Sequence, residues 1–92
     1  MKIEVCIFGA GGHAQVIEDI LSSSDDYEVV AFCVREKDLV STPESINNIP
    51  VIDEIEALEK FGAGVIGIGN NELRKKLSQV ILAENNDFNF IT

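Results

Sequence analysis

The sequence predicts an α/β fold built on a doubly wound parallel sheet of five strands, with helices on both faces of the sheet. Short, nearly continuous apolar runs alternate with stretches of helical periodicity, which is typical of a parallel sheet with crossover helices. The apolar runs lack the polar alternation of a half-exposed strand, so both faces of the sheet should be covered. A glycine-rich turn joins the first run to the first helix, and together these features indicate a Rossmann-like architecture.

The first strand is expected over residues 2–8, "KIEVCIF", and a helix over residues 13–23. The apolar side chains of this helix form one stripe, made of Val16, Ile17, Ile20 and Leu21. The polar segment "SSSDD" ends the helix. Residues 28–34, "EVVAFCV", are β-branched and aromatic, which predicts the second strand.

Residues 35–48 are polar and contain Pro43 and two adjacent asparagines, so we expect a loop there. The third strand is short, "IPVI" at residues 49–52. Pro50 has no N–H to donate to a neighbouring strand, which requires an edge position or the start of a strand.

A short helix should follow, with Asp53 as its N-cap and Gly62 just past its end. Residues 63–69, "AGVIGIG", predict the fourth strand. Asn70 is a suitable N-cap for a long helix through about residue 85. The apolar stripe of that helix consists of Leu73, Leu77, Val80 and Ile81. The closing "FNFI" predicts the fifth strand.

Right-handed crossovers limit how these elements can be connected. The expected strand order is 3-2-1-4-5, with the switch point between strands 1 and 4. Because ligands of open α/β sheets bind at the carboxyl ends of the strands beside such a switch point, the turns after strands 1 and 4 should face one crevice.

Chain length, net charge and hydropathy argue against several classes of function. The chain of 92 residues suits one domain, residues 1–92, with a formal net charge of -9 from seven basic and sixteen acidic residues. This charge argues against binding nucleic acid or an anionic membrane. No segment approaches the roughly 18 apolar residues of a membrane span, and no signal peptide is recognisable, so we expect a cytoplasmic protein.

The two cysteines, Cys6 and Cys33, lie inside apolar runs and should be reduced, buried hydrophobic residues. With a single histidine, the chain offers no set of metal ligands at a recognised spacing.

The segment "GAGGHA", residues 9–14, matches the pattern G-x-G-x-x-G/A between a strand and a helix. Gly9 allows a sharp turn, Gly11 allows a ligand to approach the backbone, and Ala14 allows close packing of helix on sheet. Exposed N–H groups at the helix N-terminus would then bind a phosphate. The alternative is a tight turn that binds nothing. The expected ligand contacts in this turn are Gly9, Ala10, Gly11, Gly12 and His13.

The positive end of the helix dipole disfavours a charged imidazole, so we interpret His13 as a neutral ligand contact rather than a catalyst, and we expect no catalytic residue. The segment "GIGNNELRKK", residues 67–76, should open on the same crevice, where Asn70 and Asn71 can donate and accept hydrogen bonds. Arg74 either draws an anion to the site or belongs to a solvated face, and the sequence leaves this open.

In dinucleotide-binding domains an acidic residue at the tip of strand 2 binds the ribose hydroxyls. Here strand 2 ends in "FCVREKD", which places Val34 and Arg35 at the tip. An NAD site would need Glu36 or Asp38 to reach the ribose, and the chain is short for a two-lobed site. A ligand of mononucleotide size therefore fits better.

Together, "IFGAGGHAQVIEDIL" and "GIGNNELRKKL" resemble the N-terminal domain of the PglD/NeuD-type sugar acetyltransferases, which act in bacterial glycan synthesis. The resemblance covers essentially the whole chain. It implies a Rossmann-like domain that binds a UDP-sugar at the glycine turn and the strand-4 loop. By the same resemblance, Gly69, Asn70 and Asn71 would line the wall opposite the glycine turn. In that family a left-handed β-helix of hexapeptide repeats follows, forms trimers, binds acetyl-CoA and carries the catalytic histidine.

The sequence departs from that family in two respects. The family commonly has an aspartate pair after strand 2, where this chain has "FCVR", and the 92 residues contain no hexapeptide repeat. We therefore expect a UDP-sugar-binding domain without its own cofactor, whose parent protein is a trimeric, acetyl-CoA-dependent enzyme. Two alternatives remain open: an NAD(P)- or mononucleotide-binding module with a regulatory or redox role, and an interaction domain that binds no ligand.

Overall fold

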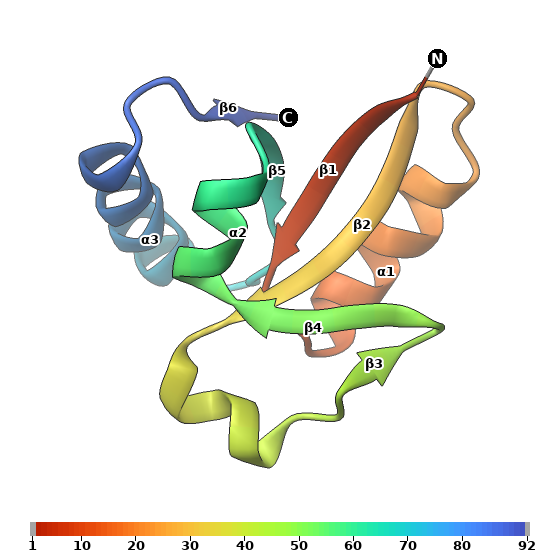
Figure 1. Ribbon diagram of the computed structural model, residues 1–92, viewed down its shortest axis with the longest axis horizontal. Helices are drawn as coiled ribbons and strands as arrows, with labels where there is room; N and C mark the ends of the chain where they lie inside the picture. The colour runs from red at the N-terminus through yellow and green to blue at the C-terminus, as the bar shows by residue number, and fades with distance from the viewer. Residues whose placement is uncertain (1, 92) are drawn as a thin grey trace.

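The computed structural model describes residues 2–91, which fold into a central sheet flanked by helices (Figure 1). The elements in chain order are β1 (Ile3–Phe8), α1 (Gly12–Ser22), β2 (Tyr27–Val34), the 3₁₀ helix η1 (Glu36–Ser41), β3 (Ser45–Ile46), β4 (Ile49–Asp53), α2 (Glu54–Lys60), β5 (Ala63–Ile66), α3 (Asn71–Glu84) and β6 (Asn89–Phe90).

The strand order in the sheet is β3-β4-β2-β1-β5-β6, and every pair is parallel except β3 with β4. The predicted order 3-2-1-4-5 is confirmed, since the five expected strands correspond to β4, β2, β1, β5 and β6. Helix α1 covers one face of the sheet and α2 and α3 cover the other (Figure 1). The prediction of helices on both faces is therefore correct.

The strand count was wrong, because the sheet has six strands rather than five. The sixth is β3, which lies inside the predicted loop and pairs antiparallel with β4, Ile46 opposite Ile49. Asn47 and Asn48 connect the two strands with φ angles of 52° and 66°. Asparagine tolerates this left-handed region, which a two-residue hairpin turn requires at both positions.

A buried carboxylate fixes this hairpin to α1. Glu18 is only 7% exposed. Its Oε1 accepts a hydrogen bond from Asn47 Nδ2 at 2.9 Å, and its Oε2 accepts one from Ser22 Oγ at 2.6 Å. Because Glu18 and Asn47 are 29 positions apart in the sequence, no local sequence pattern predicts this contact. The hairpin turn is thus held by tertiary contact as well as by its own backbone preference.

The core has two layers, one on each face of the sheet. Phe32 and Ile7 lie under α1, and Phe8 and Cys33 lie under α2 and α3, where they pack with Ile81 of α3. All five side chains are at most 1% exposed. Cys6 and Cys33 are both free and buried, as the apolar runs around them predict. Burial on both faces is what continuous apolar strands in a parallel sheet require.

One strand end and the burial of one helix face differ from the prediction. The strand expected over residues 63–69 ends at Ile66. The N–H of Gly67 still donates to the carbonyl of Phe8 at 2.8 Å, after which the chain turns away. In addition, Val16 and Ile20 of the α1 stripe are 60% and 64% exposed. Only the inner side of that stripe packs on the sheet, because within residues 2–91 no other helix covers β5 and β6 on the α1 face.

The longest helix of the described chain, α3, has 14 residues. A transmembrane helix needs about 20 predominantly apolar residues. No helix within residues 2–91 meets the length and hydropathy of a membrane span.

Candidate functional site

Gly9 is required by the fold. Its φ of 125° lies in a region that other residues rarely adopt. A Cβ atom at this position would lie 2.8 Å from the carbonyl oxygen of Gly67. The Gly9 N–H donates to the carbonyl of Cys33 at 2.8 Å, which extends the β1–β2 pairing past the end of the strand. The sharp turn predicted for Gly9 therefore has a structural cause independent of any ligand.

Gly11 and Gly12 are different, because neither is required by the fold. No atom of residues 2–91 beyond their chain neighbours and their own helix backbone lies within 4 Å of a Cβ placed on either residue. Neither residue has a positive φ angle. Ala10, between Gly9 and Gly11, packs its side chain on the core, so it can offer a ligand only its backbone. The two glycines leave open space at the mouth of the turn, where a phosphate could reach the backbone.

The close packing predicted for Ala14 is made by two residues together. A Cβ atom on Gly67 would lie 2.9 Å from both Cα and Cβ of Ala14, and 2.7 Å from Cγ2 of Ile7. Ala14 itself is completely buried. The absence of a side chain at Gly67 therefore lets α1 approach the end of β5, which the sequence analysis did not foresee.

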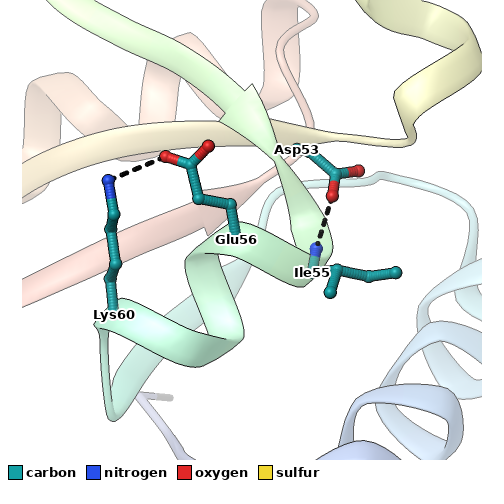
Figure 2. Close-up of polar contacts among 4 residues, drawn as sticks. All are labelled: Asp53, Ile55, Glu56 and Lys60. Carbon is teal, nitrogen blue, oxygen red and sulfur yellow. Dashed lines mark hydrogen bonds and ion pairs between the residues drawn. The ribbon is translucent and has the colours of Figure 1, made fainter.

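The N-terminus of α1 carries neither a side-chain cap from residues 2–91 nor an acidic residue in its first turn. The other two α-helices have both. Asp53 Oδ2 accepts from the Ile55 N–H at 3.2 Å, and Asn70 Oδ1 accepts from the Leu73 N–H at 3.0 Å, as the sequence predicts. Figure 2 shows the Asp53 cap together with the ion pair between Glu56 and Lys60 of α2. The first-turn amides of α1 are thus free to bind an anion.

The turns after β1 and β5 meet, as the predicted strand order requires. The Nδ1 atom of His13 lies 4.0 Å from the position of a Cβ atom on Gly69. The oxygen of Asn70 is occupied by its cap to α3, and the oxygen of Asn71 accepts a hydrogen bond from Arg74. Both asparagines can therefore still donate hydrogen bonds to a ligand through their side-chain NH₂ groups.

Two hollows flank these turns. The carboxyl-end hollow, of about 330 Å³, lies beyond the ends of β1 and β2 and includes Gly9, Val34 and Arg35 in its lining. The α1–α3 trough, of about 680 Å³, runs between α1 and α3 along β5 and β6. His13, Asn71 and Arg74 lie on the trough side. The predicted site residues are therefore not gathered in one pocket. Three line each hollow, and the remaining five, in the two turns, line neither: Ala10, Gly11, Gly12, Gly69 and Asn70.

Sequence reasoning missed an acidic residue in the carboxyl-end hollow. The parallel pairing of β4 with β2 places Asp53 opposite Val34, and Glu54 follows in the first turn of α2. Glu54 lines the hollow together with Arg35 and Asp38. The predicted order, with strand 3 beside strand 2, contained the signal that these ends lie together. The sequence of strand 2 by itself contains no sign of this acid, because Glu54 follows a different strand.

The environment of Glu54 disfavours its charged form. Partial burial is the main cause and raises the pKa of the carboxyl group above its usual value of 4.5. The guanidinium of Arg35 lowers this pKa, and the carboxylates of Asp53 and Asp38 raise it further, with burial as the larger influence. In this partly buried environment, the carboxyl group can accept a hydrogen bond from a ligand hydroxyl group or, when protonated, donate one to it.

Replacing Glu54 with glutamine is expected to increase the stability of the domain at neutral pH. A pKa raised on folding means that the carboxyl group contributes to stability while protonated, and that this contribution is lost as pH rises through the raised pKa. Urea denaturation from about pH 4 to pH 8 should therefore give a smaller loss of stability for Glu54→Gln than for the wild type. Glu59→Gln, at an exposed position of α2, is the control. Equal pH slopes for the wild type and Glu54→Gln would contradict the expectation.

The family model described as the PglD N-terminal domain matches residues 4–81, a stretch that contains both turns and most of the sheet. No curated protein sequence matches the chain.

Proposed function

The chain belongs to the PglD N-terminal domain family, and from this premise we propose that it binds a nucleotide sugar, specifically a UDP-sugar, with the phosphates at the glycine turn. The domain would present this substrate to the acetyltransferase of which it is a part. The observation that carries the proposal is the open space around Gly11 and Gly12. Glycines that neither backbone conformation nor packing demands are best explained by a ligand that needs the backbone uncovered.

The arrangement of charge supports this placement. The uncapped amides of α1 provide positive potential in a domain whose net charge is -9. The carboxyl-end hollow is lined by the acids Asp38 and Glu54 and by the bases Arg35 and Lys76, so it offers a phosphate no excess of positive charge. Carboxyl groups are good hydrogen-bond acceptors for hydroxyl groups. We infer that the phosphates lie at the turn and that the nucleoside extends into the carboxyl-end hollow, with a ribose hydroxyl group near Glu54.

His13, at the edge of the same turn, is proposed as a ligand contact. The resemblance to the family attaches catalysis, acetyl-CoA binding and trimer formation to the β-helix, so no catalytic role is assigned to residues 1–92. The proposed role of this domain is to hold and orient the sugar nucleotide, in the company of Gly69, Asn70 and Asn71.

One observation favours a second candidate, an NAD- or mononucleotide-binding module. That function needs an acidic group within reach of a ribose at the end of β2. Asp38 lines the carboxyl-end hollow with Val34, and Glu54 adds a second carboxyl group there. The same hollow can therefore serve an adenine nucleotide, and only a ligand comparison separates the two candidates.

Isothermal titration calorimetry with UDP, UDP-N-acetylglucosamine, AMP and NAD tests the proposal. We expect saturable heat with the two uridine ligands, with dissociation constants between about 10 μM and 1 mM. Binding of NAD or AMP without binding of UDP would favour the second candidate. The absence of heat with every ligand at millimolar concentration would contradict both and favour a domain that binds no nucleotide.

A further inference from the structure

The α1–α3 trough is mostly apolar below the turns. Its floor is formed by Val65, Phe90 and Ile91 of β5 and the β6 region, and its α1 wall includes Ile17 and Ile20. Within residues 2–91 no helix covers this part of the sheet, whereas α2 and α3 cover the opposite face. The trough has a volume of about 680 Å³ and a mostly apolar lining, which is within the range of clefts that hold a bound group.

A ridge of apolar side chains stands beside this trough on α1. Val16 and Ile20 are one helical turn apart and are 60% and 64% exposed. Ile20 also lines the trough, so the ridge continues the apolar wall outward toward solvent. Asp19, adjacent in sequence to Ile20, is exposed. At 100° per residue it lies on the outward side of the ridge. Helix α1 therefore presents an apolar ridge with an acidic flank.

The opposite wall of the trough is basic. Arg74 and Lys75 of α3 line it, and both are exposed. They are two of only seven basic residues in the chain. Within the described part of the chain, the one ion pair joins Lys60 to Glu56, so neither Arg74 nor Lys75 is neutralised by a carboxylate. A surface complementary to the trough would therefore have an apolar ridge with an acidic residue beside it.

We propose that a second copy of this chain occupies the trough, with the two copies related by a two-fold axis. In this arrangement α1 of each copy lies in the trough of the other. Val16 and Ile20 contact the apolar wall and floor, and Asp19 faces Lys75 of the other copy. A two-fold interface is self-complementary, so one ridge and one trough on the same face are sufficient to form it twice.

The second copy fits better than an unrelated partner because α1 itself has the two features that the trough requires. The pair is expected to be weak, since two chains of charge -9 repel each other at long range and the complementary charges are solvent-exposed. We expect a dissociation constant between about 10 μM and 1 mM, in the range of transient interfaces. The proposal rests on the trough and the α1 ridge rather than on nucleotide-sugar binding, although His13 and Asn71 line the trough as well as the proposed ligand site.

Analytical ultracentrifugation of the chain from about 10 μM to about 1 mM tests the proposal. The wild type should change from monomer to dimer over this range. Ile20→Glu should remain monomeric or raise the dissociation constant at least about tenfold, because it places a charge in the apolar contact. Val40→Glu is the matched control, since Val40 is 94% exposed on η1, which contributes no residue to the lining of the trough. Circular dichroism of both variants shows whether they fold.

A charge exchange provides a test that changes only exposed residues. Asp19→Lys and Lys75→Glu should each weaken the dimer, and the double variant should recover most of the lost affinity. A wild type that is monomeric at about 1 mM would overturn the proposal. It would also be overturned by an Ile20→Glu variant that dimerises like Val40→Glu, or by a double variant weaker than both single variants.

Discussion

Replacing Gly9 with alanine is expected to lower the free energy of unfolding by about 3 kcal/mol. Two independent causes add. Alanine at a φ of 125° is strained, and its Cβ would lie 2.8 Å from the carbonyl oxygen of Gly67. Since the clash is with backbone, it cannot be relieved by rotating a side chain. Relief would have to shift the ends of β1 and β5 apart, at the position where Gly67 donates to Phe8.

Urea denaturation monitored by circular dichroism measures this loss. Gly62→Ala is the matched control, because a Cβ atom there meets no other residue of the described chain within 4 Å and its φ is not positive. Its stability should stay within about 0.5 kcal/mol of the wild type. A Gly9→Ala variant as stable as Gly62→Ala would show that the turn can relax, contrary to the conformation described above.

Replacing Gly12 with alanine is expected to lower the affinity for the ligand without lowering the stability of the domain. The variant should fold at least as stably as the wild type, with a gain of up to about 0.5 kcal/mol, because alanine favours helix and its Cβ enters open space. Its affinity for the UDP-sugar should fall at least about tenfold, since the Cβ occupies the space through which the phosphates approach the amides. Calorimetry and thermal denaturation of the same sample give both quantities.

Gly62→Ala again serves as the control, because it adds the same atoms away from the turn and should bind like the wild type. Equal affinity of Gly12→Ala and wild type would contradict the placement of the phosphates at this turn. Whether the domain binds a nucleotide at all is tested separately, by the titration of the wild-type chain. A loss of both affinity and stability would instead mean that Gly12 has a structural role that its surroundings do not reveal.

Much of the fold could be predicted because the sheet is parallel and buried. Continuous apolar runs mark the central strands, and the right-handed crossover limits their order, so 3-2-1-4-5 followed from the positions of the runs. The caps Asp53 and Asn70 were also correct, since capping depends on local sequence.

The edge of the sheet was harder to predict. The hairpin of β3 and β4 has a turn of two asparagines rather than the usual Asn-Gly, and its anchor is the distant side chain of Glu18. The exposed part of the α1 stripe has a similar origin. Periodicity shows that Val16 and Ile20 share a face, but it does not show how much of that face has a neighbouring element.

The sequence predicted the positions of the backbone turns in the candidate site better than the side chains that line it. The meeting of the two glycine turns follows from strand order, and the structure places His13 beside Gly69 accordingly. The sequence pattern assigned the sharp turn to Gly9, and the structure shows that the fold requires Gly9 but not Gly11 or Gly12. Glu54 was missed because it reaches the hollow from a neighbouring strand.

The hydrogen bonds at the base of the glycine turn bear on the kinetics and entropy of ligand binding. Gly9 donates to Cys33 and Gly67 donates to Phe8, both at 2.8 Å, so the carboxyl ends of β1, β2 and β5 are tied together at the mouth of the site. A receptor surface that is ordered before the ligand arrives loses little conformational freedom on binding. Differences in affinity among ligands of this turn should therefore lie in how fast they leave rather than in how fast they arrive.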